Sequence, residues 1–147
     1  MAPGARIVDV GSKPIQQREA EARGLLTLQP ATLQAIRDGK VAKGDVVAVA
    51  QAAGLLAVKR TPDLLPLCHP IPLAGAEVHL ALLEGAIEAR CVVRAAHTTG
   101  VEMDALTGCA VALLTVWDMV KSLEKDARGQ YPTTALQELR VVRKVKQ

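Results

Sequence analysis

The chain of 147 residues contains no phenylalanine, and its only aromatic side chains besides histidine are those of Trp117 and Tyr131. Proteins that bind single-stranded nucleic acid stack bases on aromatic side chains, and duplex binders carry a strongly basic surface. A net charge of +3 and two such aromatics supply neither feature, so no nucleic-acid partner is expected. The basic residues that do cluster, at Lys59-Arg60 and in RVVRKVK near the C-terminus, suit a small polyanionic ligand better than a duplex.

Cysteine is also scarce, with three residues and no close spacing between them. An odd number of separated cysteines favours reduced thiols in the cytoplasm over the disulfide framework of a secreted protein. We expect no signal peptide, and no apolar run long enough to cross a membrane. These absences predict a cytoplasmic protein with no membrane partner.

Small aliphatic side chains are abundant instead: alanine, valine and leucine dominate the 50% of residues that are apolar, and 22% of residues are charged. This balance is typical of a globular chain. The length predicts a single domain over residues 1–147, which would bury roughly two thirds of its unfolded surface. Thin layers of small side chains are often completed by a neighbouring subunit, so we also expect an oligomer.

The order of predicted elements indicates the fold class. An extended N-terminal arm is expected over residues 1–20. Strands are predicted over 22–29, 76–85, 86–94 and 135–146, and helices over 31–40, 45–61 and 98–126, from the period of the apolar residues. This order predicts an α+β ferredoxin-like sandwich, a four-stranded antiparallel sheet with helices on one face.

Local signals mark several ends of these elements. Asp45 is the expected N-cap of the second helix, and Gly85 predicts a hairpin between two strands. Thr99 followed by Glu102 reads as a capping box at the start of the long helix.

Cys68 and His69 lie in the segment DLLPLCHPIPL, where three prolines exclude a helix interior or a central strand. Neighbouring residues in extended backbone point to opposite sides, so the two do not form a catalytic dyad. The cysteines and histidines lack zinc-ligand spacing, and no metal is expected. Two interpretations stay open: a buried thiol beside a surface imidazole, or a rigid ligand-binding loop.

The long helix carries the acids. Glu102 and Asp104 fit ordinary roles in its first turn, whereas Asp118 lies among apolar neighbours and has Lys121 three residues later. Helical rotation places Asp104 and Asp118 on one stripe that could line a cleft. Lys43 and Lys144, like Lys121, have an ordinary interpretation as solvated surface lysines. The residues alone thus indicate a site with a few cations, one acid and one imidazole.

Three longer motifs resemble a known family. KGDV, KRTPDLLPLCHPIPL and TGVEMDALTGCAVALLTVWDMVKSLEKD are similar to the cyclic pyranopterin monophosphate synthase family, molybdenum cofactor biosynthesis protein C. The similarity runs from residue 7 to about residue 144.

The resemblance implies a reaction and an assembly. Members of this family are lyases that convert (8S)-3′,8-cyclo-7,8-dihydroguanosine 5′-triphosphate, the product of a radical-SAM GTP cyclase, to cyclic pyranopterin monophosphate. Diphosphate is released, and no metal or other cofactor is needed. The family has a ferredoxin-like fold and forms homohexamers, trimers of dimers, with active sites at subunit interfaces. A rival hypothesis is a non-catalytic ferredoxin-like module that binds a small anion and regulates a partner.

The resemblance also implies roles for individual residues. By motif, the catalytic residues are Asp118, Lys43 and Lys121, and the substrate-binding residues are Leu67, Cys68, His69, Glu102, Met103, Asp104 and Lys144. Asp104 stands where the family commonly has glutamate, and the C-terminal tail is shorter than usual. Because the site residues are spread along a small chain, we expect Lys43 and Asp118 to meet from different subunits.

Overall fold

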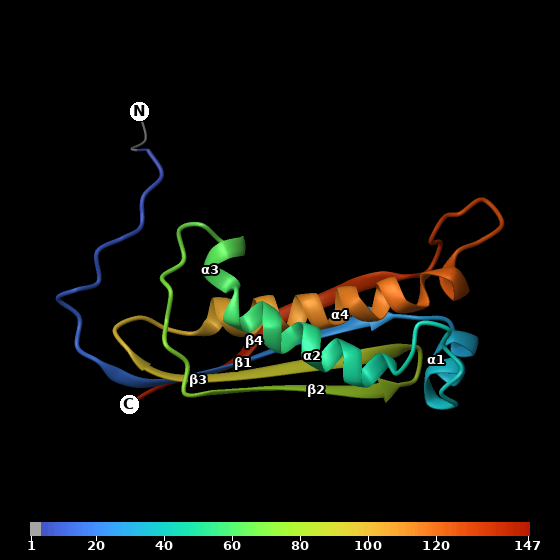
Figure 1. Cartoon of the computed structure of the whole chain (residues 1–147), viewed down its shortest axis with the longest axis horizontal. Coiled ribbons are helices and arrows are strands. Elements are labelled where there is room, and N and C mark those ends of the chain that lie inside the picture. Colours follow the sequence, from blue (N-terminus) through green and yellow to red (C-terminus); the bar gives the residue numbers. More distant parts are fainter. Residues whose placement is uncertain (1–3) are drawn as a thin grey trace.

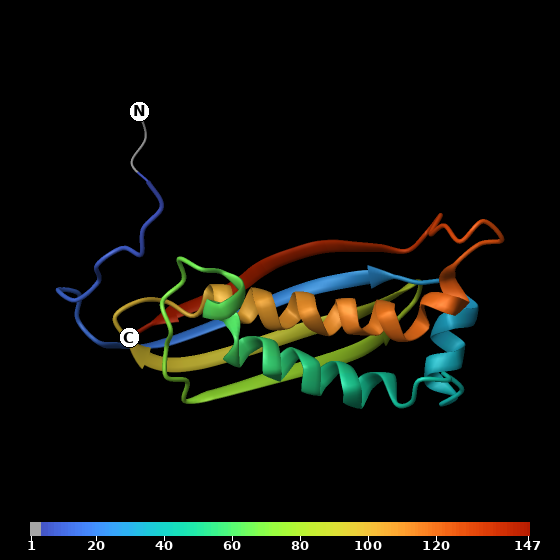
Figure 2. The same cartoon turned by 45° about the horizontal axis from the view of Figure 1, so that its top comes forward.

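The computed structural model describes residues 4–147. Its elements are β1 (Gln16–Thr27), α1 (Pro30–Arg37), α2 (Val46–Lys59), α3 (Thr61–Leu64), β2 (Gly75–Leu83), β3 (Ala86–His97), α4 (Glu102–Glu124) and β4 (Ala135–Lys146). The four strands have the order β2-β3-β1-β4, and every neighbouring pair is antiparallel. Helices α2 and α4 lie along one face of this sheet (Figures 1 and 2). The predicted ferredoxin-like α+β fold is therefore confirmed.

The core lies between the sheet and the two long helices. Alternate residues of β1 and β3 face the helices and are buried, as the period of a strand requires. Helices α2 and α4 approach each other closely at two glycines: a Cβ on Gly108 would lie 2.5 Å from Val58, and one on Gly54 would lie 3.0 Å from the Gly108 carbonyl oxygen. Larger residues at these positions would push the two helices apart.

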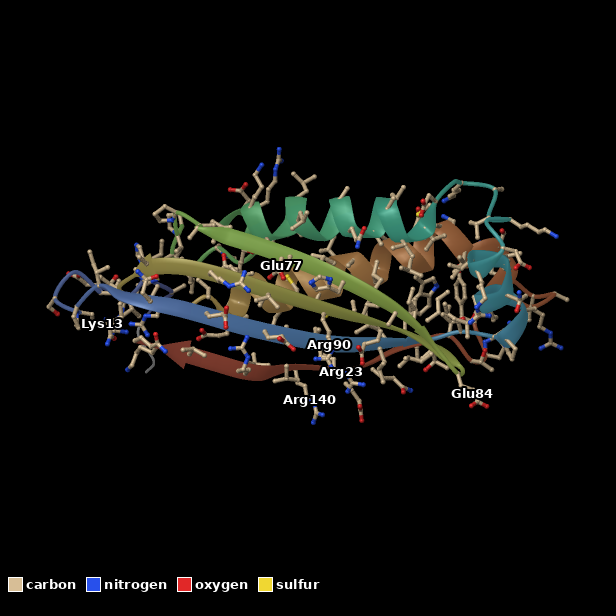
Figure 3. The ribbon with its side chains drawn as sticks, turned by 90° about the horizontal axis from the view of Figure 1, so that it is seen from below. Lys13, Arg23, Glu77, Glu84, Arg90 and Arg140 are labelled. Carbon is tan, nitrogen blue, oxygen red and sulfur yellow. The ribbon has the colours of Figure 1, made fainter. Side chains whose placement is uncertain are left out.

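The opposite face of the sheet carries a network of ion pairs. Figure 3 shows two of their arginines, Arg23 and Arg90, on the side of the sheet away from the helices. Arg90 contacts Glu21 at 2.8 Å and Glu88 at 2.9 Å, and Arg23 contacts Glu88 at 2.5 Å. The Arg90–Glu21 and Arg23–Glu88 contacts join β1 to β3, whereas the Arg90–Glu88 contact lies within β3. The Glu88 and Glu21 side chains are only 12% and 18% exposed, so these pairs are better shielded from solvent than ordinary surface pairs.

A buried carboxylate, that of Glu124, makes hydrogen bonds at the C-terminal end of α4. Glu124 is 0% exposed and accepts hydrogen bonds from the Gln29 amide at 3.0 Å, from the Thr134 hydroxyl at 2.6 Å and from the Thr32 hydroxyl. These bonds tie α4 to the start of α1 and of β4. No local sequence pattern marks Glu124, because its partners are distant in the chain.

Several expected boundaries hold and others shift. Asp45 accepts a hydrogen bond from the Ala48 amide at 3.0 Å, and Gly85 has a φ of 76° in the hairpin, so both predictions are confirmed. Strand β1 begins at Gln16, which shortens the arm to residue 15; residues 1–3 of the expected arm lie outside the described residues.

The predicted capping box at the start of α4 is wrong. The helix begins at Glu102 and not at residue 98, and its N-cap is Val101, which has no capping side chain. The Glu102 carboxylate instead lies 3.5 Å from Lys144 on β4. A tertiary contact thus replaces the local one.

The expectation that no apolar run is long enough to cross a membrane is wrong for α4. Its 23 residues are apolar enough to cross a membrane by length and composition. Core helices meet the same criterion, and here one side of α4 is buried against the sheet.

Candidate active site

Three of the expected site residues meet at the C-terminal half of α4. The Lys43 Nζ lies 3.0 Å from Asp118 Oδ2, and the Lys121 Nζ lies 3.2 Å from Asp118 Oδ1. We call Lys43, Asp118 and Lys121 the lysine–aspartate cluster. All three line one hollow of about 230 Å³. Each carboxylate oxygen therefore has its own ammonium partner at the edge of an open site.

The fold explains this arrangement. Asp118 and Lys121 are three residues apart on α4, so they share a helix face. Lys43 lies in the turn between α1 and α2, and α2 packs beside α4. The Lys43 ammonium also donates to the main-chain oxygen of Asp118 at 3.1 Å. The expectation that Lys43 and Asp118 come from different subunits is therefore wrong, because the turn brings them together within one chain.

The electrostatics of the lysine–aspartate cluster favour an ionised acid. Hydrogen bonds from Lys43 and then from Lys121, with the charges of both lysines, lower the pKa of Asp118 below its ordinary value. The Asp118 side chain is 59% exposed, so it can meet a ligand. A carboxylate that stays ionised can accept a proton, and the ammonium groups can stabilise negative charge beside it.

The other expected residues gather at the opposite end of α4. The pocket there, of about 480 Å³, is lined by residues of the proline-rich segment and of the start of α4: Leu65, Pro66, Leu67, Cys68, His69, Ile71, Thr99, Gly100, Glu102 and Met103. We call it the proline-loop pocket. The side chains of Leu67 and Met103 are 49% and 41% exposed, so apolar surface is offered at its rim.

Two acids lie near the proline-loop pocket: Glu102 lines it, and Asp104 does not. Glu102 Oε2 and Asp104 Oδ2 are buried atoms with no hydrogen-bond partner within residues 4–147. Burial, with a smaller contribution from Glu102, raises the pKa of Asp104 to about 6. Asp104 is 2% exposed and is absent from the pocket lining, unlike Glu102. The expected cleft along one stripe from Asp104 to Asp118 is therefore wrong, since the first is buried and the second exposed.

The thiol and the lysine beside this pocket have different surroundings. Burial, then the charges of Asp104 and Glu102, raises the pKa of Cys68 above its ordinary value. Cys68 therefore stays a thiol and is poorly suited to act as a nucleophile. The Lys144 ammonium lies 3.5 Å from the Glu102 carboxylate and so stands beside this pocket without lining it.

Arg18 was missed by the sequence analysis. Its guanidinium donates to the main-chain oxygens of His97 at 3.4 Å and of Thr98 at 3.2 Å, and so shapes the loop before α4. It shares a hollow of about 190 Å³ with Gly100 and Lys144. Only the pairing of β1 with β3 and β4 brings these residues together, and no local motif signals it.

The two halves of the expected site are separated. Glu102 and Asp118 lie at different ends of α4, and the rise of a helix puts them roughly 24 Å apart. The structure thus brings together Lys43, Asp118 and Lys121 in one group, and the proline-rich segment, Glu102 and Lys144 in another. Within residues 4–147, no group of three or more histidine, cysteine, aspartate or glutamate side chains could hold a metal ion.

The fold and the contacts define a class: an α+β protein with one carboxylate held between two lysines at an open hollow. Similar proteins define the class further. Residues 7–146 match the model of the MoaC family. The chain is 55% identical over 143 residues to a probable cyclic pyranopterin monophosphate synthase of Pyrococcus abyssi, an alignment that covers 97% of this chain and 90% of that protein.

Two further relatives agree. Identity is 55% over 144 residues to a protein of the same name in Pyrococcus furiosus, with 98% of this chain and 92% of that one covered. It is 54% over 143 residues to a probable cyclic pyranopterin monophosphate synthase accessory protein of Methanothermobacter thermautotrophicus, with 97% and 90% covered. The chain belongs to the MoaC family.

Proposed function

We propose that this protein is a lyase of molybdenum cofactor biosynthesis. It converts (8S)-3′,8-cyclo-7,8-dihydroguanosine 5′-triphosphate to cyclic pyranopterin monophosphate and releases diphosphate. The observation that carries this proposal is the lysine–aspartate cluster, which sits at the motif positions where the family has its catalytic residues. The names of relatives that align with 97% of the chain support it.

The cluster suits the chemistry. Opening one ring, closing another and forming a cyclic phosphate all require proton transfers, and diphosphate must leave. Asp118, kept ionised by its two lysines, is placed to accept a proton. Lys43 and Lys121 supply positive charge for the phosphates. Positioned acids and bases typically contribute about 10²–10⁴-fold each.

The complete site, in this proposal, forms between two subunits. A gap of roughly 24 Å along one helix separates the cluster from the proline-loop pocket. A two-fold axis near the middle of α4 would place the partner's proline-loop pocket beside this chain's lysine–aspartate cluster. It would equally place this chain's pocket beside the partner's cluster. The exposed apolar side chains of Val49, Leu56 and Leu114 on α2 and α4 support a contact there.

The wider setting follows from the resemblance. We propose a homohexamer built as a trimer of such dimers, and a radical-SAM GTP cyclase as the enzyme that supplies the substrate. A cytoplasmic location is proposed from the three cysteines, all of which are free thiols.

Turnover separates this proposal from a non-catalytic anion-binding module. Incubation with the cyclic dihydro-GTP should give diphosphate and a pterin-type product. Lys43→Ala should abolish both, while Lys125→Ala, which removes an exposed lysine one turn beyond Lys121, should leave the rate unchanged. Ligand binding without either product would support the regulatory module instead.

A further inference from the structure

The N-terminal arm touches the proline-loop pocket through one hydrogen bond. His69 Nε2 lies 2.6 Å from the main-chain oxygen of Val8, a contact between residues that are 61 positions apart. Figure 1 shows the arm (blue) beside the loop between α3 and β2 (green), and Figure 2 shows the same neighbours after a turn of 45°. His69 also lines the pocket. The arm thus contacts the imidazole from outside the pocket that the same ring helps to form.

The chemistry of this contact determines the state of the imidazole. A carbonyl oxygen can only accept a hydrogen bond, so Nε2 must carry the proton and donate it. In neutral histidine the other nitrogen then has no proton, because the hydrogen bond at one nitrogen sets the tautomer of the ring. Nδ1 of His69 is therefore a hydrogen-bond acceptor while the imidazole is neutral.

We propose that the N-terminal arm positions His69: the Val8 carbonyl accepts a hydrogen bond from Nε2–H and leaves Nδ1 to accept a hydrogen bond from an N–H or O–H group of the ligand. This assigns a role to a segment that precedes the sheet. The role of His69 in ligand binding rests on the proposed function, whereas the tautomer of His69 is independent of that function.

The arm has its own means of presenting that carbonyl. Asp9 Oδ1 accepts a hydrogen bond from the Gly11 amide at 2.8 Å, and the Lys13 amide donates to the Val10 oxygen at 3.1 Å. The Val8 side chain is 58% exposed. The geometry therefore depends on the turn after Val8 and on its main-chain oxygen, and little on its side chain.

Four variants test this dependence. Deletion of residues 2–9 removes the carbonyl, and the fold should survive because β1 begins at Gln16. Asp9→Ala breaks the turn, whereas Asp9→Asn keeps an oxygen that can accept from Gly11. Val8→Ala keeps the carbonyl and is the matched control.

The tautomer is read from ¹⁵N spectra of the imidazoles in the full-length protein, at a pH where histidine is neutral. The His69 signals are assigned with His69→Ala. The native chain, Val8→Ala and Asp9→Asn should show the Nε2–H form. The deletion and Asp9→Ala should show the tautomer mixture of a free imidazole. An unchanged tautomer in the deletion variant would overturn the proposal.

Ligand affinity gives the second readout, with the cyclic dihydro-GTP as the probe in calorimetry. The deletion and Asp9→Ala should weaken binding by about three- to tenfold, the loss of one neutral hydrogen bond, with Asp9→Asn near the native value. A changed tautomer with unchanged affinity would overturn the positioning role. A chain that binds the probe but never turns it over would overturn the proposed function alone.

Discussion

Whether the active site is shared between subunits can be tested by mixing two damaged chains. His69→Ala removes a side chain of the proline-loop pocket, and Asp118→Asn removes the carboxylate of the lysine–aspartate cluster. If each site takes its pocket from one subunit and its cluster from another, a mixed oligomer contains some sites with both halves intact. This recovery is expected from the proposed shared site, in which the two halves lie roughly 24 Å apart within each chain.

The size of the recovery follows from counting. In a random one-to-one mixture, half of the chains supply an intact pocket and half supply an intact cluster, so about a quarter of all two-chain sites are complete. With substrate well below KM, oligomers of His69→Ala alone should retain about a third to a tenth of the rate, for the loss of the neutral hydrogen bond that His69 accepts from the ligand. Oligomers of Asp118→Asn alone should be inactive. The mixture should therefore exceed the average of its parents.

A second mixture serves as the control. Lys43 and Asp118 pair at 3.0 Å within one chain, so Lys43→Ala mixed with Asp118→Asn can never restore a complete cluster. Chains with two different affinity tags would be co-expressed, purified on both tags and assayed for diphosphate release. If doubly tagged oligomers that mix His69→Ala chains with Asp118→Asn chains release diphosphate only at the average rate of the two parents, the shared site is refuted. Recovery in the Lys43→Ala mixture would refute the single-chain cluster.

Three further outcomes follow from single substitutions. Asp118→Asn should keep its unfolding temperature, because the side chain is exposed, and should lose turnover. The pKa of Asp118, followed by the ¹³C signal of its carboxylate, should rise when Lys43→Met removes the contact that lowers it. A folded, active Asp118→Asn would argue against its role as a base. Calorimetry on His69→Ala should show affinity lowered by about three- to tenfold, for the loss of one neutral hydrogen bond, and unchanged affinity would return His69 to a surface role. The pKa of Asp104 is raised from 3.8 to about 6, so the folded state binds the proton more tightly and stability falls as pH rises through that window. Asp104→Asn should remove this fall and raise the unfolding free energy near neutral pH by on the order of 2 kcal/mol, as measured by urea titration; an equal fall in the variant would contradict the assignment.

The sequence alone predicted the fold and one contact of the candidate site. Strand alternation and the long apolar helix identified the ferredoxin-like order of elements, since each signal depends on residues close in the chain. The same reasoning placed Asp118 and Lys121 on one helix face, because the spacing of three residues fixes it. Asp45 and Gly85 also acted as their local chemistry requires.

Contacts between distant segments were decided only by the tertiary structure. Lys43 pairs with Asp118 because α2 packs beside α4, and Glu102 turns from a capping role towards Lys144 because β4 returns along β1. Asp104 was expected at an open cleft and is buried, since its side of α4 faces the sheet. The bond from His69 to Val8 likewise joins segments that no local pattern relates. Turns and helix faces are set by neighbours three or four residues away, whereas the partner and the burial of a charged group depend on which remote element packs against it.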